Sequence, residues 1–458
     1  CVDSFHILSR GSDPAGIADI PSEKLFFLQL ADAPVMDMDV LQWSRHYRLF
    51  PGQGTFDLPA FLGHVLTAGY TGPLSLEVFN DVFRQSDPAR AAVDALRSLL
   101  ALQEETAGRL SPEVRQRVHL LELPRPQRLG GHAFVELAVD GGSAGQVEGT
   151  LAALGFGRSG QHRSKPVQLW QQGEARVLLN SAAGRPGASI AALGIETDDA
   201  VTSARRAEAL LAPVLPRSRG PAEADLSAVA APDGTSVFFC TTGAGPASWL
   251  SDFAPAADVS PDGGSSAIAH VDHVALTQPF DHFDEAALFY RSILGLSTQH
   301  ASEVAAPFGL VRNRTVTDPA QNVRIGLSVS VLRRGEEWQP GVTAPQHVAF
   351  ATDDALAVAR AARQAGAPLL QIPDNYYDDV DARLAPPADL LREMQSLGVL
   401  YDRDADGEFL HFYTEVLGGR VFFEVVQRIG GYSGYGEVNA PVRMAAHRRQ
   451  RSTAIGAP

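Results

Sequence analysis

The feature that most constrains the fold of this chain is an internal repeat in its C-terminal two-thirds. Thr197-Asp-Asp199 recurs as Thr352-Asp-Asp354, and Val237-Phe-Phe239 recurs as Val421-Phe-Phe423. Each copy is predicted to form a strand, a helix and then several strands. Its apolar residues first occur at every second position, then with helical spacing, and then at every second position again. The repeat therefore predicts a duplicated α+β region in which each copy builds its own sheet.

Composition shifts mark the domain boundaries. We expect the two copies at 131–245 and 265–445, separated by a stretch rich in Pro, Asp, Gly and Ser at 254–267. Residues 1–103 form a different, alternating α/β region, and the polar and Pro-containing stretch 104–130 is typical of a linker.

Aligning the copies on their shared motifs reveals three metal-ligand side chains in the second copy that the first copy lacks. They are His273, His347 and Glu424, which align with Phe134, Ala192 and Cys240, respectively. Two neutral imidazoles and one carboxylate on one face of an octahedral iron(II) ion leave three adjacent positions open. The pattern predicts a metal site of this kind.

Taken alone, each of these residues could have a purely structural role, since a histidine in a strand is commonly a core residue whose hydrogen bonds are satisfied. Glu424 is harder to explain in this way. It follows Val421-Phe-Phe423 and precedes two valines, and a carboxylate is rarely buried in such a run without a cation or a metal. Three coincident replacements at matched positions favour the metal.

The N-terminal region alternates strand-like and helical patterns, which predicts a parallel sheet covered by helices. Strand-like runs cover Val2–Leu8, Lys24–Leu30 and Pro73–Phe79, and helices are expected to begin at Asp57 and Asp87. About three units are too few for an eight-unit barrel. We therefore expect the C-terminal part of a TIM-type (β/α)8 barrel, with the earlier part missing before the first residue.

Polar residues on these runs are candidate barrel-site groups. Asp3, Gln29 and Glu77 lie where barrel enzymes place active-site residues, and oxygen ligands suit Mg, Mn or Co. The alternative is that each is a barrel-layer residue or a solvated strand end.

The charge and the cysteine count exclude several classes of partner. Lys plus Arg is 38 and Asp plus Glu is 53, so the net charge is −15. Such a chain repels phosphate backbones and anionic lipids, and we expect neither nucleic acid nor membrane as a partner. The two cysteines cannot form a disulfide framework and fit a reducing cytoplasm. A small-molecule substrate is expected, and a homo-oligomer is left open.

Residues 131–440 resemble 4-hydroxyphenylpyruvate dioxygenase, an enzyme of the vicinal-oxygen-chelate (βαβββ) fold. The matching motifs are Val271-Asp-His273, Gln346-His-Val-Ala-Phe350, Pro373-Asp-Asn-Tyr-Tyr377, Leu400-Tyr-Asp-Arg-Asp404 and Val421-Phe-Phe-Glu-Val-Val-Gln-Arg428. The resemblance implies an iron(II) site whose ligands map onto the same three side chains as the repeat comparison.

Two segments depart from that family. Ile325-Gly-Leu-Ser-Val-Ser330 stands where the family shows a Pro-Leu-Asn-Glu-Pro-like stretch. In Val438-Asn-Ala-Pro-Val-Arg443, the family's helical phenylalanine is absent and Pro441 is expected to break the C-terminal helix. Both departures favour a substrate other than 4-hydroxyphenylpyruvate.

The N-terminal region resembles the sugar phosphate isomerase/epimerase-like barrels, most closely the bacterial two-domain 3-dehydroshikimate dehydratases. The motifs are Asp3-Ser-Phe-His-Ile-Leu-Ser-Arg10, Gln29-Leu-Ala-Asp-Ala-Pro34 and Pro51-Gly-Gln-Gly54. The resemblance implies metal ligands at Asp3, Gln29 and Glu77, a fourth ligand before the first residue, and an acid/base or positioning role for His6.

Three hypotheses of function follow from these resemblances. The first is a lyase of quinate and shikimate degradation that converts 3-dehydroshikimate to protocatechuate. Under this hypothesis, residues 1–458 alone are expected to lack dehydratase activity. The second is an active iron(II) dioxygenase acting on an aromatic 2-oxoacid. The third is a non-catalytic assembly or ligand-sensing module.

Overall fold

The computed structural model describes residues 1–182, 184, 186–216, 219–220, 223–243, 248–256, 267–307, 309–333 and 345–454. The chain divides into two compact units. The first comprises Cys1–Pro126, Arg205–Pro213 and Asp281–Gly295, and the second comprises Gln127–Ala204, Val214–Phe280 and Leu296–Pro458. The predicted inter-copy stretch 254–267 lies largely outside the described residues, and the domain boundaries stay a prediction.

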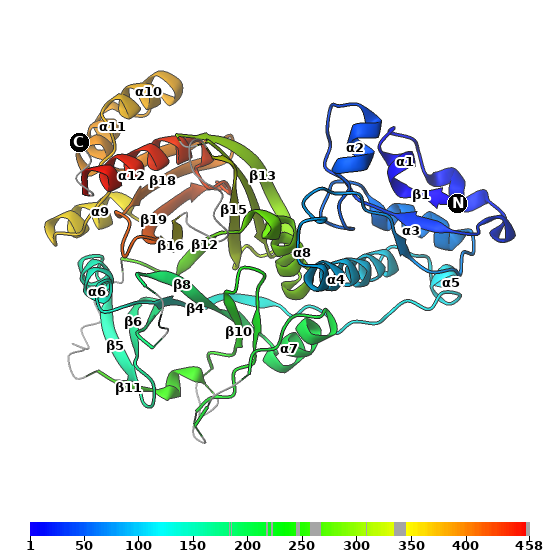
Figure 1. Ribbon diagram of the computed structural model, residues 1–458. Coiled ribbons are helices and arrows are strands. Elements are labelled where there is room, and N and C mark those ends of the chain that lie inside the picture. Colours follow the sequence, from blue (N-terminus) through cyan, green and yellow to red (C-terminus); the bar gives the residue numbers. More distant parts are fainter. Residues whose placement is uncertain are drawn as a thin grey trace. The chain divides into compact units, whose positions relative to one another are not determined.

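The first unit holds a three-stranded parallel sheet with helices beside it (Figure 1). Its strands are β1 (Val2–Asp3), β2 (Leu28–Leu30) and β3 (Ser75–Leu76). Its helices are α1 (Ser4–Leu8), α2 (Val40–His46), α3 (Leu58–Thr67), α4 (Pro88–Ala107) and α5 (Pro112–Arg115), with short 3-10 helices η1 (Ala15–Asp19) and η2 (Ser22–Lys24).

Strand alternation in β2 separates the core from the candidate site. Leu28 and Leu30 are buried against Phe61 and Leu62 of α3. Gln29 lies between them and projects to the opposite face of the sheet, because side chains alternate along a strand. The apolar face holds the strand in place, and the polar face is left for chemistry.

The expectation that Val2–Leu8 is one strand is wrong beyond its second residue. The strand ends at Asp3, whose carboxylate accepts a hydrogen bond from the backbone N–H of His6 and caps helix α1. Local capping by an Asp side chain outweighs the apolar pattern that suggested a longer strand. The turn carries His6 back beside Asp3 instead of along the sheet.

The two predicted helix starts are confirmed. Asp57 caps α3, with Pro59 in the first turn, and Asp87 caps α4 with Pro88 as the first helical residue. The side chain of Asp87 accepts a hydrogen bond from the backbone of Arg90 at 2.9 Å. Both helices use the same Asp and Pro signals because proline has no N–H to satisfy at a helix start.

The first copy of the repeat forms an eight-stranded sheet in the order β11-β5-β6-β7-β4-β8-β10-β9. Its strands are β4 (Leu129–Ala138), β5 (Gly157–His162), β6 (Val167–Gln172), β7 (Ala175–Asn180), β8 (Ser189–Thr197), β9 (Ala228–Ala230), β10 (Ser236–Cys240) and β11 (Phe253–Pro255). Its helices are α6 (Ala144–Ala153), α7 (Ala200–Ala209) and η3 (Trp249–Asp252).

The second copy forms another eight-stranded sheet in the order β13-β14-β15-β12-β16-β19-β18-β17. Its strands are β12 (Val271–Thr277), β13 (Ser297–Ala306), β14 (Gly309–Thr317), β15 (Arg324–Arg333), β16 (Gln346–Ala351), β17 (Leu400–Arg403), β18 (Gly407–Tyr413) and β19 (Val421–Gly430). The accompanying helices are η4 (Phe280–His282), α8 (Phe283–Leu294), α9 (Ala355–Gln364), α10 (Asn375–Leu384), α11 (Ala388–Leu397), η5 (Glu437–Asn439) and α12 (Ala440–Ala454).

The two sheets share one pairing scheme, which is the structural form of the repeat. In the first, β4 pairs antiparallel with β8 and parallel with β7, and β8 pairs parallel with β10. In the second, β12 pairs antiparallel with β16 and parallel with β15, and β16 pairs parallel with β19. The duplication is therefore one of topology as well as sequence.

Strand register corrects one pair in the sequence alignment. In the second sheet, Ala349 lies between His273 and Glu424. At the matching place in the first sheet, Gly194 lies between Phe134 and Phe238. The counterpart of Glu424 is thus Phe238 and not Cys240, because β10 is shifted by two residues along its neighbour and a shift of two preserves the face.

The expectation that Pro441 breaks the C-terminal helix is also wrong. Helix α12 runs from Ala440 to Ala454, and Pro441 lies in its first turn. A first-turn proline needs no intrahelical hydrogen-bond partner, so it starts this helix instead of interrupting it.

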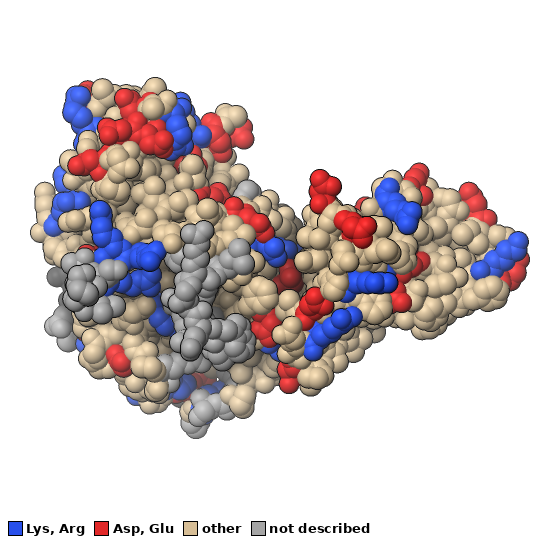
Figure 2. Space-filling model, turned by 45° about the horizontal axis from the view of Figure 1, so that its top comes forward, with Lys and Arg blue, Asp and Glu red and all other residues tan. Residues whose placement is uncertain are grey.

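On the face drawn in Figure 2, acidic side chains are interspersed with Lys and Arg. Around α9, α10 and α11 they form exposed ion pairs, such as Arg360 with Glu393 and Arg383 with Asp379. Within the described parts of the chain, no helix has the length and apolar character needed to cross a membrane.

Candidate metal centres

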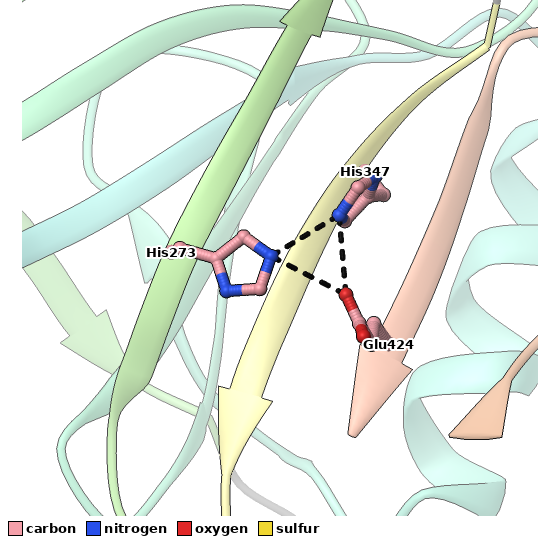
Figure 3. Close-up of side chains that lie close together, drawn as sticks. All are labelled: His273, His347 and Glu424. Carbon is pink, nitrogen blue, oxygen red and sulfur yellow. Dashed lines mark hydrogen bonds and ion pairs between the residues drawn. The ribbon is translucent and has the colours of Figure 1, made fainter. Parts of the chain in front are cut away.

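The second sheet brings His273, His347 and Glu424 together on three neighbouring strands (Figure 3). His273 is on β12, His347 on β16 and Glu424 on β19. His273 and Glu424 lie on either side of Ala349, and His347 points to the same face because it precedes Ala349 by two residues. A sheet register therefore assembles three side chains that are far apart in the sequence.

The spacing of the three ligand atoms suits one divalent ion. Nε2 of His273 is 3.2 Å from Nε2 of His347 and 3.3 Å from Oε2 of Glu424, which is 3.1 Å from Nε2 of His347. With bonds of about 2.1 Å, adjacent ligands of an octahedral ion lie roughly 3.0 Å apart and those of a tetrahedral ion roughly 3.4 Å apart. The donor set and its spacing therefore fit a metal ion.

Buried neighbours hold two of these side chains from behind. Asp272 accepts a hydrogen bond from Nδ1 of His273 at 2.7 Å, which leaves Nε2 directed at the centre. Nδ1 of the fully buried His411 lies 2.7 Å from Oε1 of Glu424, and Nε2 of His411 accepts from Asn439 at 2.9 Å. His273 and Glu424 are thereby oriented before any ion binds.

The electrostatics hold Glu424 and His347 in the protonation states that bind a metal, whereas His273 is held toward its protonated form. Burial raises the pKa of Glu424, but hydrogen bonds from His273, His347 and His411 outweigh it and hold that pKa well below its usual range. Burial lowers the pKa of His347 to about 4, so its imidazole is neutral at pH 7. For His273, hydrogen bonds to Asp272 and Glu424 overcome burial and raise the pKa. A carboxylate with a lowered pKa among three imidazoles suits a bound cation, which would take the place of the proton on His273.

A cavity of about 150 Å³ opens onto the three side chains. Its wall includes Ser328 and Ser330 from the segment that departs from the dioxygenase family, together with Arg443 of α12. The guanidinium of Arg443 lies over the rings of Tyr413 and Phe422, at 5.6 and 5.2 Å from their centres. The two segments that the sequence comparison singled out thus line the same cavity.

In the first unit, the predicted barrel-site residues gather around an arginine that the sequence did not indicate. Nη1 of Arg48 donates to Oε2 of Glu77 at 2.8 Å and to Oδ2 of Asp3 at 3.2 Å. Nη2 of Arg48 lies 3.3 Å from Nε2 of His6. Gln29 donates from Nε2 to Oε1 of Glu77 at 2.8 Å. All four predicted residues therefore belong to one cluster.

Arg48 is 1% exposed and is fixed on every side. Its Nε donates to the carbonyl of Ser44 at 3.1 Å, and the guanidinium lies over the ring of Phe5 at 4.6 Å. Two carboxylates neutralise this buried cation. The oxygen donors of Asp3, Gln29 and Glu77 are the type that hard divalent ions prefer, and the cluster fits such an ion in ligand type.

Sequence reasoning missed Arg48, Asp272 and His411. Arg48 follows Ser44-Arg-His-Tyr47, which reads as an ordinary helix end and gives no signal. His411 interrupts the apolar run Phe409–Tyr413, and Asp272 directly precedes a candidate ligand. A search for polar residues in apolar strands would have found both.

Three family models match successive parts of the chain. Residues 1–101 match "Xylose isomerase-like TIM barrel", and residues 124–245 match "Hydroxyphenylpyruvate dioxygenase, HPPD, N-terminal". Residues 270–382 match "Glyoxalase/Bleomycin resistance protein/Dioxygenase superfamily". The order of the matches is the order expected from the sequence motifs.

Two curated relatives are similar over nearly the whole chain. A 3-dehydroshikimate dehydratase of Pseudomonas putida is 40% identical over 100% of this chain and 74% of its own length. One from Pseudomonas aeruginosa is 42% identical over 98% of this chain and 73% of its own length.

Solved structures agree with these relatives. A "xylose isomerase-like TIM barrel/4-hydroxyphenylpyruvate dioxygenase fusion protein" is 39% identical, with a TM-score of 0.87 over 98% of this chain and 74% of that one. A mutant 4-hydroxymandelate synthase from Streptomyces coelicolor, at 21% identity and a TM-score of 0.60, shares the fold of 71% of the chain. The chain belongs to the family of 3-dehydroshikimate dehydratases in which a xylose isomerase-like TIM barrel is joined to a 4-hydroxyphenylpyruvate dioxygenase-like region.

Proposed function

We propose that the barrel cluster around Arg48 serves the dehydration of 3-dehydroshikimate, which loses one water to give protocatechuate. The observation that carries the proposal is that Asp3, Gln29, Glu77 and His6 meet at one buried guanidinium. Two relatives that are 40% and 42% identical over nearly the whole chain are named 3-dehydroshikimate dehydratase.

The residues have separable roles. Asp3, Gln29 and Glu77 would hold a Mg, Mn or Co ion, which supplies Lewis-acid polarisation of a carbonyl when bound. His6 takes an acid/base or positioning role, because Arg48 donates to its Nε2 and fixes the ring beside the two carboxylates. Arg48 positions His6 and both carboxylates at once.

The test is the release of protocatechuate from 3-dehydroshikimate by the purified protein that carries this sequence, with metal content measured in parallel. Glu77→Gln should lose both metal and turnover, whereas His6→Gln should keep the metal and lose turnover. Glu23→Gln, at an exposed glutamate of the same unit, is the matched control. Full turnover in His6→Gln would remove its proposed role, and full metal content in Glu77→Gln would remove the ligand assignment.

A second candidate function rests on the His273, His347 and Glu424 centre. We propose that it binds iron(II), since two imidazoles and one carboxylate leave adjacent positions for a bidentate ligand and dioxygen. The measurement is oxygen uptake on adding 4-hydroxyphenylpyruvate to protein loaded anaerobically with iron(II).

Uptake that disappears in His347→Ala would support a dioxygenase acting on an aromatic 2-oxoacid. Iron bound without oxygen uptake would contradict that activity and favour a different ligand or an assembly role.

For the compartment, we propose the cytoplasm, where the free thiols of Cys1 and Cys240 stay reduced.

A further inference from the structure

The first copy of the repeat contains a cavity of its own, on the sheet face that corresponds to the metal face of the second copy. The cavity has a volume of about 300 Å³, at the lower end of the range for small-molecule sites. Phe134 and Phe238, the counterparts of His273 and Glu424, line it. Aromatic rings therefore stand where the second copy carries two of its three candidate ligands.

The cavity is strongly aromatic. Trp249 and Phe253 complete its apolar wall, and the rings of Phe134 and Trp249 meet edge to face with their centres 4.9 Å apart. The indole N–H of Trp249 already donates to Oγ1 of Thr242 at 3.0 Å. The indole thus offers the cavity its ring and not its hydrogen-bond donor.

One carboxylate projects into this aromatic space. Glu136 lies two residues beyond Phe134 on β4 and lines the same cavity, whereas the second copy has Ala275 at the matching place. Oε1 of Glu136 accepts from Nδ2 of Asn180 at 2.8 Å. Within the described parts of the chain, Oε2 has no hydrogen-bond partner. Burial raises the pKa of Glu136 and outweighs the lowering by its hydrogen bond with Asn180 and by the charge of Lys165.

The other charged side chains that line the cavity have partners among the described residues. Nζ of Lys165 lies 2.9 Å from Oε2 of Glu223, and Arg219 lies 3.7 Å from Asp225. Asp252 accepts from the backbone of Ala224 through both oxygens. Glu136 therefore presents to the cavity an oxygen that no other described residue uses, and this oxygen can only accept hydrogen bonds while the side chain is ionised.

We propose that this cavity is a second ligand site, which binds a small phenol or catechol with its ring among Phe134, Phe238 and Trp249 and a hydroxyl donating to Glu136. A ring contacts the aromatic wall edge to face or offset, and the hydroxyl supplies the missing donor. A hydrogen bond to a carboxylate is about twice as strong as one between neutral groups. No metal takes part, since the first copy has Phe, Ala and Phe in place of the second copy's ligands.

The experiment is calorimetric titration of the whole chain with catechol after removal of metal by chelation, so that the metal centres cannot bind the probe. Veratrole, the dimethyl ether of catechol, has the same ring without a donor. Catechol should bind at one site at least 10-fold more tightly than veratrole. Glu136→Ala should weaken catechol binding about 10- to 100-fold and leave veratrole unchanged.

Two further variants keep the test decisive. Glu136→Gln retains the shape and an acceptor oxygen, and it replaces Glu136→Ala if the latter does not fold. It should weaken catechol binding by a smaller factor. Trp249→Phe keeps a ring but shortens the aromatic wall, so it should weaken catechol and veratrole by the same factor, in contrast to Glu136→Ala.

Three results would overturn the proposal. The first is catechol binding that is as tight in both Glu136 variants as in the wild type. The second is the absence of catechol binding to the folded wild-type chain, and the third is tighter binding of benzylamine than of catechol. The last would assign the cavity to an aromatic cation instead of a phenol.

Discussion

Replacing Asp272 with asparagine tests whether a buried carboxylate orients a metal ligand. Asp272 is 2% exposed and accepts from Nδ1 of His273 at 2.7 Å. The same carboxylate accepts from Arg428 at 2.9 and 3.0 Å and from Arg324 at 3.2 Å. Asparagine keeps the shape, removes the charge and turns an N–H₂ group toward one of these donors.

The structure separates two effects of Asp272→Asn. Loss of the hydrogen bond that orients His273 should weaken metal binding about 10- to 100-fold, or roughly 1.4 to 2.7 kcal/mol. Loss of the counter-charge leaves a largely buried Arg428 without its main partner, which costs about 3 to 5 kcal/mol of folding free energy. The first effect changes the metal affinity, and the second changes the folding stability even in the absence of metal.

Two assays measure these effects independently. Urea unfolding in excess chelator gives the stability difference without metal, and competition with a chromogenic chelator gives the affinity of the folded protein. Asp402→Asn is the matched control, because Asp402 accepts from the hydroxyl of Tyr432 at 2.6 Å and lies outside the candidate ligand set. It should leave the metal affinity unchanged.

Wild-type metal affinity in folded Asp272→Asn would refute the reasoning, since Nε2 of His273 would then be directed by the sheet alone. Unchanged stability in chelator would show that Arg428 finds enough solvent to stay charged without Asp272.

Three other changes test the first unit. Gly54→Ala should destabilise it by about 1 to 3 kcal/mol in urea unfolding, because a Cβ at residue 54 would overlap the Asp32 carboxylate and lie 2.5 Å from the carbonyl oxygen of Ala33, which forces the loop to move. Burial raises the pKa of Asp32 from 3.8 to about 6, so the folded state binds this proton more tightly. The resulting stability, about 3 kcal/mol, is present below pH 4 and lost as the pH rises through 6, and Asp32→Asn should flatten that slope. Arg48→Lys should lower dehydratase turnover at least 10-fold while circular dichroism stays unchanged, because an ammonium cannot bridge Glu77 and His6 as a planar guanidinium does; turnover within two-fold of wild type would contradict its positioning role.

The comparison between sequence and structure is clearest at α1 and α12. The sequence predicted a strand through Leu8 and a helix broken at Pro441, and both predictions failed at a helix start. A side-chain cap at Asp3 and a proline in the first turn are local signals, but their meaning depends on where the neighbouring backbone hydrogen bonds go.

The repeat comparison identified His273, His347 and Glu424 because each interrupts an apolar strand at a matched place in two copies. The three side chains meet on one face because both copies have the same strand pairing. Side chains alternate along a strand, so a shift of two residues leaves the same side chains on that face. That same shift is why the sequence alignment chose Cys240 where the sheet has Phe238.

The sequence by itself determined the duplicated fold, the barrel-like first region and the residue types of both candidate centres. Hydrophobic periodicity and the type of a ligand side chain are both visible in short segments of the chain. Only the tertiary structure revealed Arg48 between Asp3 and Glu77, His411 behind Glu424, and Glu136 in an aromatic cavity. Each of these depends on which strands become neighbours and on what their shared face excludes from water, and no single segment of sequence encodes that.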